Sequence, residues 1–250
     1  MLAAMQDLSS KTVLVTGASS GIGAKIAARL HEHGATVLMA GRDEEKLKDK
    51  ASAIGIASTN IIACDIANDL DGFRSALSDI PTPNVLINSA GMARNVPFLN
   101  VNEDAYDDVF GINVRAVFFV TRALVSEWLA KDINGIVLTI SSQMGHVGGP
   151  NRSVYCASKH AVEGMMKALT VEFASKGLRF LTLCPTFVDT PLARQTLSDP
   201  DMRAWVDASI PAGRLVTTSE VADTAAFLVS DSAAMITGSA VMLDGGWTAA

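Results

Sequence analysis

Tyr155 and Lys159 are the residues of this sequence whose types and spacing point most directly to chemistry. They lie four residues apart at the start of a helical pattern, so both side chains project from one helix face. A free phenol has a pKa of about 10 and is a poor base at neutral pH, but a neighbouring ammonium favours the phenolate. The pair therefore predicts a tyrosine that exchanges a proton with a bound substrate, with an exposed structural pair as the alternative.

A serine and an asparagine extend this pair. Ser142 ends a predicted strand thirteen residues before Tyr155, where its hydroxyl could share a substrate oxygen with the phenol. A plain turn residue is the alternative. Asn113 and Gly111 lie inside a predicted helix over residues 103–131, although both residue types are unfavourable in a helix interior. We therefore expect a kink that holds a bound water, with an ordinary helix irregularity as the alternative.

These side chains need a scaffold, and the strongest signal for one lies near the start of the chain. An apolar run over residues 12–16 leads into a glycine-rich turn, which opens a helical pattern marked by Ile26 and Leu30. This order places backbone N–H groups and a positive helix end against a phosphate, and glycine admits the close approach. The turn therefore predicts a dinucleotide site. Its contacts are expected from Gly17, Ser19, Ser20, Gly21, Ile22 and Gly23.

Strand-like and helical patterns alternate along the whole chain. Predicted strands cover residues 12–16, 36–40, 60–63, 85–88, 135–141, 179–183 and 240–243, and predicted helices cover 21–33, 44–53, 70–77, 103–131, 154–176 and 219–230. Continuously apolar strands joined by helices predict an α/β protein. We expect a single-domain Rossmann fold over residues 1–250, a doubly wound seven-stranded parallel sheet with helices on both faces. Its ligands should bind beyond the carboxyl ends of the strands.

The residues after the second predicted strand bear on the choice of cofactor. Arg42 can grip a 2′-phosphate, so the sequence favours NADP, with NAD and a solvated arginine as the alternative. Asp43 is expected to cap the next helix.

The third and fourth predicted strands are also followed by candidate cofactor contacts. Asp65 is either an acceptor for the adenine amino group or another helix cap, and Ile66 follows it. The small residues Ala90 and Gly91 let the backbone lie against a ribose. Asn88 is expected to tie neighbouring strands together through its side chain.

Together these motifs resemble those of the short-chain dehydrogenase/reductase family. The resemblance rests on the glycine-rich turn of residues 16–23, on Asn88-Ser89-Ala90-Gly91, and on Asn113, Ser142, Tyr155 and Lys159 in this order. It implies an oxidoreductase that moves a hydride between C4 of nicotinamide and a secondary alcohol or ketone. It also implies a homotetramer.

The resemblance assigns a role to each candidate catalytic residue. Tyr155 would be the general acid/base, and Ser142 would polarise the substrate oxygen. Lys159 would lower the pKa of Tyr155 and hold the ribose, and Asn113 would position a water that relays protons to Lys159. Arg42 stands where NADP-preferring members carry a basic residue.

Two positions depart from the family pattern. Ser89 replaces a second asparagine, and Thr186 replaces the glycine expected after Pro185. A Cβ at Thr186 is expected to narrow the nicotinamide pocket or change the turn. Val188 and Thr190 still match the positions that meet the carboxamide.

Two segments are expected to border the substrate. The loop between Ser142 and Tyr155 carries Gln143 and His146 and is similar to loops of some sugar or sugar-acid dehydrogenases; a His146 without a role is the alternative. The long segment 189–211 predicts a lid, with Leu192 among its apolar cover.

Composition limits the partners and the location. The 250 residues carry a net charge of −6, which disfavours nucleic acid as the main partner. Three cysteines in or beside apolar runs predict a reduced, cytoplasmic protein. We expect no secretory signal, no membrane span and no metal. A 3-oxoacyl-thioester reductase on the same scaffold is one rival, and a nucleotide-binding regulator without catalysis is the other; the intact catalytic set speaks against the regulator.

Overall fold

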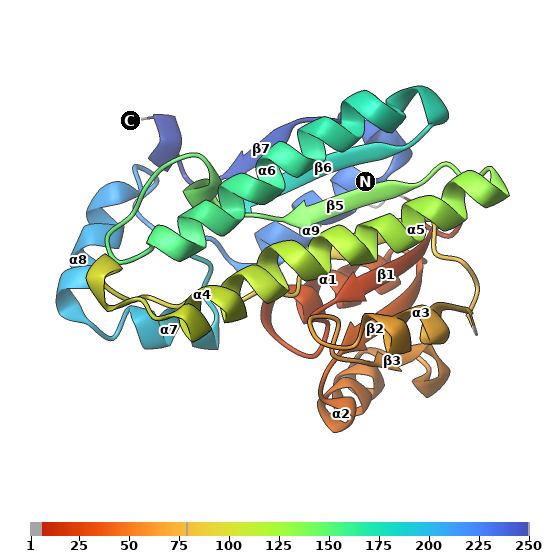
Figure 1. The fold of residues 1–250 in the computed structure, drawn as a ribbon, viewed down its shortest axis with the longest axis horizontal. Helices are drawn as coiled ribbons and strands as arrows, with labels where there is room; N and C mark the ends of the chain where they lie inside the picture. The colour runs from red at the N-terminus through yellow and green to blue at the C-terminus, as the bar shows by residue number, and fades with distance from the viewer. Residues whose placement is uncertain (1–6, 79, 250) are drawn as a thin grey trace, which may run out of the picture.

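The computed structural model describes residues 7–78 and 80–249, without the side chains of Pro191, Leu192 and Gln195. Its centre is one seven-stranded sheet in the order β3-β2-β1-β4-β5-β6-β7 (Figure 1). All neighbouring strands pair in parallel. The strands are β1 (Thr12–Thr16), β2 (Thr36–Gly41), β3 (Ile61–Ala63), β4 (Val85–Asn88), β5 (Ile136–Ile140), β6 (Arg179–Pro185) and β7 (Ala240–Leu243). The predicted fold class is confirmed.

Helices cover both faces of the sheet because the central strands are apolar on both sides. The helices are α1 (Gly21–Glu32), α2 (Glu44–Ile54), α3 (Leu70–Ser78), α4 (Glu103–Phe110), α5 (Val117–Lys131), α6 (Ser153–Phe173), α7 (Pro191–Thr196), α8 (Pro200–Ser209) and α9 (Thr218–Val229). One buried cluster joins the sheet to α1, α2 and α9, and a second joins it to α3, α5 and α6. Every residue of β4 and β5 is buried between them.

The strand order fixes where a ligand can enter. The chain winds outward from β1 through β2 to β3, then returns to β4 on the other side of β1 and winds the opposite way. The connections after β1 and β4 therefore diverge and leave a crevice at the carboxyl edge of the sheet. The glycine-rich turn and residues 89–92 both start there.

The long helix 103–131 is interrupted, as the sequence predicts. A π-helical turn, Gly111–Ala116, joins α4 to α5 and contains Asn113. π-Turns recur at functional sites because they release backbone groups from the regular ladder. The whole stretch Glu103–Lys131 is also long and apolar enough to cross a membrane, by length and composition alone. Here it is a core helix, since Val120, Leu124 and Trp128 pack under the sheet.

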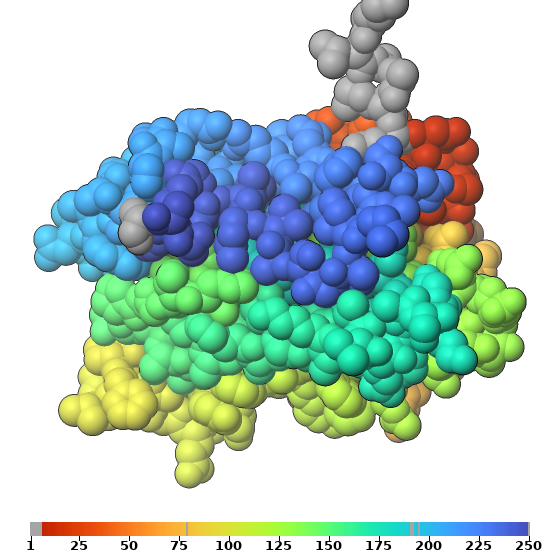
Figure 2. All heavy atoms as spheres, turned by 90° about the horizontal axis from the view of Figure 1, so that it is seen from above, coloured from red at the N-terminus to blue at the C-terminus, as the bar shows by residue number. Residues whose placement is uncertain are grey.

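The segment 189–211 contains structure that the sequence analysis did not predict. It folds into the short helices α7 and α8, which begin with prolines at positions compatible with a first helical turn. Figure 2 shows this light blue region at one end of the molecule, beside the dark blue C-terminal residues. The Trp205 ring contacts Trp247 at 5.0 Å between ring centroids, which ties α8 to the C-terminal segment.

Trp128 anchors the end of α5 and generates a stability prediction. It is fully buried, and its Nε1 donates to the Pro83 carbonyl at 2.6 Å. A Cβ added at Gly135 would overlap its ring. We expect Gly135→Ala to lower the free energy of unfolding by about 1–3 kcal/mol, measured by urea denaturation. Gly148→Ala is the control, because its added methyl meets no atom within 4 Å; equal effects of both substitutions would contradict this packing.

Candidate active site

A cavity of about 220 Å³ opens at the carboxyl ends of β4, β5 and β6. It brings together three of the four predicted catalytic residues, Ser142, Tyr155 and Lys159. Two cationic side chains, Lys159 and Arg152, line it, and none of its described lining residues is acidic. Its remaining lining residues are Ile22, Ser89, Gly91, Met92, Ala93, Asn95, Ile140, Ser141, Gln143, Met144, Pro185, Thr186, Phe187, Val188, Thr190, Ala193 and Thr196.

Tyr155 lies in the first turn of α6 and is half-buried. Burial raises the pKa of its phenol, because a phenolate loses its water there. The nearby Ser142 hydroxyl and the positive charge of Arg152 lower that pKa in part. The net direction is upward, so the phenol holds its proton in the ligand-free protein.

The structure adds a second cation beside this phenol. Lys159 Nζ lies 5.7 Å from the phenol ring centroid and donates to the Ile140 carbonyl at 2.9 Å. The positive charge of Arg152, which the sequence analysis did not identify, lowers the pKa of the phenol in the ligand-free protein.

Lys159 is 7% exposed, and its burial disfavours the charged form of its side chain. Burial lowers the pKa of its ammonium to about 8, although Cys184 and Glu163 act in the opposite direction. A Cβ at Gly91 would lie 3.9 Å from Nζ, so the small residue predicted at this position brings the backbone close to the ammonium.

Asn113 lies behind this pair and is 1% exposed. Its Oδ1 accepts from the Met92 N–H, and its Nδ2 donates to the Met92 carbonyl, both at 2.9 Å. Nδ2 also donates to Ser158 Oγ at 3.0 Å. The side chain thus fastens the loop after β4 to α6. Any water at the predicted kink must therefore use the backbone groups that the π-turn releases rather than this amide.

The turn after β1 fits a dinucleotide phosphate. Gly17 and Gly21 adopt positive φ values of 67° and 54°. A Cβ at Gly17 would lie 2.8 Å from the Ala90 Cα, and one at Gly23 would overlap the Gly17 carbonyl. The helix α1 starts without a side-chain cap from Ser20 and without an acidic residue in its first turn. Its first N–H groups are therefore available to an anion, as predicted.

The predicted adenosine contacts are placed as follows. Arg42 is exposed at the end of β2, and Asp43 caps α2 by accepting from the Lys46 N–H at 3.0 Å. Asp65 accepts from the Ala67 N–H at 3.1 Å within a local turn. It is not the helix cap given as its alternative, because α3 begins at Leu70 and Asp69 accepts from the Gly72 N–H there. Ile66 is buried in the core cluster below α3 and α5.

The predicted role of Asn88 as a tie is confirmed. Its Nδ2 donates to Thr139 Oγ1 of β5 at 3.3 Å and to Thr121 Oγ1 of α5 at 3.2 Å. This use of the amide leaves its contribution to a cofactor indirect, since the side chain is 2% exposed.

The connection after β6 forms the wall of the cavity that the sequence predicts to meet the nicotinamide. Pro185, Val188 and Thr190 all line it, and Thr190 caps α7 by accepting from the Ala193 N–H at 3.2 Å. Thr186, the departure from the family pattern, is 6% exposed and also lines the cavity. Its Oγ1 is buried without a hydrogen-bond partner among the described residues.

Of the predicted substrate residues, the structure brings Gln143 to the cavity and leaves His146 outside it. Gln143 is 1% exposed, and its Oε1 accepts from the Ser142 hydroxyl at 2.9 Å. His146 instead points toward Glu163 and Cys184, with its Nε2 3.5 Å from the nearer carboxylate oxygen. Leu192 lies in α7, and its side chain is outside the described residues.

The His146, Glu163 and Cys184 donor atoms all lie within 4.8 Å of one another, a distance at which they could share a metal ion. They already form a hydrogen-bonded network, because the Cys184 thiol donates to Glu163 at 3.2 Å and the Thr182 hydroxyl donates at 2.9 Å. Burial raises the pKa of Cys184 to about 12, so the thiol keeps its proton. The sequence analysis missed this cluster because its members come from three separate elements.

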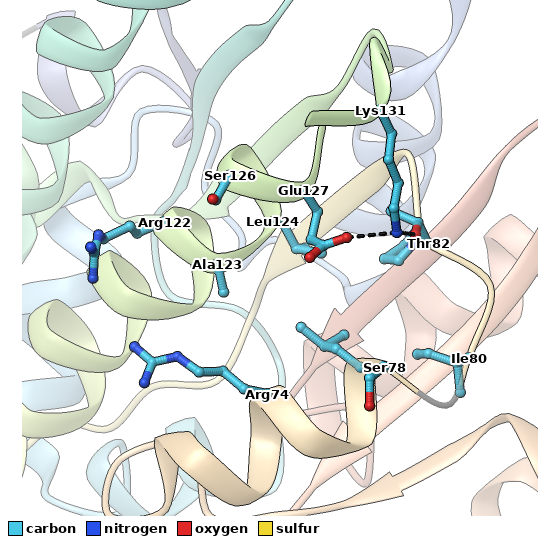
Figure 3. Close-up of a pocket in the computed structure, with 12 residues that line it drawn as sticks. Arg74, Ser78, Ile80, Thr82, Arg122, Ala123, Leu124, Ser126, Glu127 and Lys131 are labelled. Atoms are coloured by element: carbon cyan, nitrogen blue, oxygen red, sulfur yellow. Dashed lines mark hydrogen bonds and ion pairs between the residues drawn. The ribbon is translucent and has the colours of Figure 1, made fainter. Parts of the chain in front are cut away.

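A larger cavity of about 800 Å³ lies elsewhere, between α3 and the end of α5 (Figure 3). None of the predicted site residues lines it. Three of its charged side chains are paired locally: Lys131 Nζ lies 2.6 Å from Glu127 and 2.8 Å from Thr82 Oγ1, and Arg74 pairs with Asp71 at 2.8 Å. We assign the chemistry to the smaller cavity because the proton-transfer groups converge there.

Comparisons with known proteins agree with this assignment. A family model described as enoyl-(acyl carrier protein) reductase matches residues 17–248. L-xylulose reductase of Bos taurus is 35% identical over 242 residues, covering 97% of this chain and 98% of that protein. The chain belongs to the short-chain dehydrogenase/reductase family. It is therefore an oxidoreductase that uses a nicotinamide dinucleotide and acts on CH–OH groups.

Other members of the family are similar over their whole length. A 3-oxoacyl-(acyl-carrier-protein) reductase of Rickettsia felis is 34% identical, covering 97% of this chain and 98% of that protein. A gluconate 5-dehydrogenase from Burkholderia cenocepacia, solved with NADP and tartrate, has a TM-score of 0.89 at 27% identity and covers 98% of both chains.

Lys159 generates a prediction that separates stability from catalysis. We expect Lys159→Met to abolish turnover yet raise the free energy of unfolding of the ligand-free protein by about 2 kcal/mol at pH 7. The gain follows from removing an ammonium whose pKa falls from 10.5 to about 8 on folding. Denaturation with urea at several pH values measures it.

The difference in free energy of unfolding between Lys159→Met and the wild type depends on pH, because folding lowers the pKa of Lys159. The cost of the buried charge is present in full below pH 8, because the lysine is then protonated in both states. As pH rises from 8 to 10.5, the folded lysine loses its proton first, so the wild type gains stability and the difference narrows. Lys167→Met, at an exposed position of α6, is the control. A variant less stable than the wild type at pH 7 would contradict the assignment.

Proposed function

We propose that this short-chain oxidoreductase prefers NADP(H) and interconverts a secondary alcohol and a ketone of the sugar, polyol or sugar-acid type. The observation that carries the proposal is the convergence of Ser142, Tyr155 and Lys159 in one cavity beside a glycine-rich phosphate cradle. When bound, the nicotinamide would supply or accept the hydride.

Each catalytic side chain then has a physical task. Tyr155 gives its proton to the carbonyl oxygen during reduction and takes it back during oxidation, which suits a phenol that is protonated at rest. The Ser142 hydroxyl holds the same oxygen and fixes its position. Lys159 adds the positive charge that stabilises a phenolate once the cavity is closed to water. Asn113 joins the loop after β4 to α6 and so holds the π-turn in place, where its released backbone groups can bind a relay water.

The preference for NADP rests on Arg42. Its guanidinium is exposed, and no ion pair or hydrogen bond with a described residue occupies it. A free, planar guanidinium at the end of β2 is suited to grip a 2′-phosphate. NAD remains the alternative cofactor.

The sugar-type substrate is supported by two kinds of observation. Gln143 and Thr186 give the cavity polar capacity, and the gluconate 5-dehydrogenase and L-xylulose reductase relatives act on sugars or sugar acids by name. The second candidate is a 3-oxoacyl-thioester reductase, which the Rickettsia felis relative favours.

We also propose that residues 189–211 form a lid. Thr190, Ala193 and Thr196 line the cavity, so α7 forms part of its wall, and α8 follows it in the chain. An ion pair at 2.8 Å between Arg194 and Asp189 holds the start of the segment.

We further propose that the protein forms a homotetramer and lies in the cytoplasm. The exposed apolar side chains of α5, Phe118 at 46% and Leu129 at 45%, support an assembly through this helix. The free thiols of Cys64, Cys156 and Cys184 support a reducing compartment.

Tyr155→Phe tests the acid/base role. We expect the variant to lose at least about 10³-fold in kcat while its Kd for NADP stays within a factor of three, because one hydroxyl is removed from the proton path. Tyr106→Phe is the matched control, since Tyr106 is 45% exposed and stacks on Phe110 away from the cavity. Retained turnover in Tyr155→Phe would overturn the role.

Arg42→Gln tests the cofactor preference. We expect the KM for NADP to rise about 10- to 100-fold while the KM for NAD changes less than threefold, because only NADP carries the 2′-phosphate. Steady-state kinetics with both cofactors measure this. Parallel losses with NADP and NAD would refute the assigned contact.

A further inference from the structure

Arg152 is a buried cation in the active-site cavity without an acidic partner. It precedes α6 and is 6% exposed. Its Nε and Nη2 atoms are buried and have no hydrogen-bond partner among the described residues. Its guanidinium stacks on a ring instead, with Cζ 4.9 Å from the Phe187 centroid. The side chain therefore lines the cavity and carries N–H donors that no described residue pairs.

The stem of Arg152 is held in place by its neighbours. A Cβ added at Gly149 would lie 3.2 Å from the Arg152 Cδ and 2.9 Å from the Met144 Cε, so this side chain packs closely against the loop after β5. Phe187 is itself stacked on Trp247, with ring centroids 6.1 Å apart. Stacking on a ring face leaves the in-plane N–H groups of the guanidinium free to bind.

Arg152 also lies close to the reacting atoms. It is three residues before Tyr155, and its positive charge acts on the phenol. Both side chains line the same cavity as Ser142. A group bound to Arg152 would therefore belong to the same small molecule whose oxygen meets the phenol.

The cofactor phosphates do not account for this cation. Their cradle lies after β1, and Arg42 lies after β2, whereas Arg152 follows β5 on the other side of the crevice. The nearer candidates for a partner are the residues that line the cavity, and none of those described carries a carboxylate. A buried guanidinium without a partner is unfavourable, so an anionic ligand is the partner that the site lacks.

We propose that Arg152 binds a carboxylate of the substrate, and that the enzyme therefore acts on hydroxy acids and the corresponding keto acids rather than on neutral sugars or polyols. This inference rests on the proposed function, because it names the substrate class of the same site. A carboxylate is the planar acceptor that matches the guanidinium fork in two parallel hydrogen bonds. The oxidised carbon then lies at Tyr155 and Ser142.

Matched substrate pairs test the inference. Gluconate and sorbitol, and xylonate and xylitol, each differ in a carboxylate against a CH₂OH group. We expect the wild type to show a kcat/KM at least about 100-fold higher for the acid of a pair. Arg152→Met should remove that advantage, mainly through KM, and lower kcat/KM for the acid at least about tenfold more than for its neutral partner. Arg152→Lys should recover part of it, because a lysine keeps the charge without the fork.

A binding measurement makes the test independent of turnover. With NADPH bound, which cannot accept a hydride from them, gluconate and xylonate should quench the fluorescence of Trp247 and Trp205 saturably, since Phe187 contacts both rings. Arg152→Met should weaken this binding at least tenfold. Arg94→Met is the control, because Arg94 lies near the cavity rim but is half-exposed and paired with Asp108 at 2.6 Å.

The outcomes separate the two proposals. Equal use of acids and neutral partners by the wild type, or equal losses on both in Arg152→Met, would overturn the carboxylate assignment and leave the alcohol–ketone chemistry standing. The carboxylate assignment would also be overturned if the acids did not quench the tryptophan fluorescence of the wild type, or if Arg152→Met bound them as tightly as the wild type does. A wild type that binds carboxylates through Arg152 but oxidises no secondary alcohol with either cofactor would instead refute the proposed function.

Discussion

The hydrogen bond from Lys159 Nζ to the Ile140 carbonyl holds a positive charge under the carboxyl edge of the sheet, and the chemistry of the site depends on it. Burial works against this charge and lowers the pKa of the ammonium to about 8. The fold tolerates the cost because α6 is fixed at several points, including the Asn113 contact to Ser158. A cation kept here at the expense of stability is a typical sign of a functional site.

The same constraint explains how the cavity selects its contents. Lys159 and Arg152 face a space whose described walls carry no carboxylate, so their positive charges stabilise a negative charge placed there. A phenolate, a developing alkoxide and a substrate carboxylate are all anions. Each can therefore form in, or enter, this cavity at lower cost than in a neutral apolar pocket.

The sequence predicted the fold well because its signals are local and periodic. Apolar runs of four to seven residues gave the strands to within about two residues, and the turn after β1 has a strict glycine requirement. Spacing on one helix was enough to place Tyr155 and Lys159 together. The position of Ser142 at the end of the preceding strand made it a candidate, and the family resemblance assigned its role.

The parts that the sequence did not predict depend on contacts between distant elements. Nothing local distinguishes Arg152 from a solvated arginine before a helix, because its burial comes from Phe187, 35 positions later, and from the loop after β5. His146 was expected at the substrate, yet Glu163 and Cys184 draw it away from the cavity. The direction of the Tyr155 pKa shift likewise depends on how deeply the phenol is buried.

The state of the Tyr155 phenol with cofactor bound tests the central claim most directly. The protein has two tyrosines, so ultraviolet difference titration of the wild type against Tyr155→Phe isolates one phenol. With NADP⁺ bound, the account predicts a phenolate that appears at least one pH unit below the ordinary value of about 10, and no such signal in the variant. A Tyr155 phenol that titrates above 10 in this complex would contradict the account.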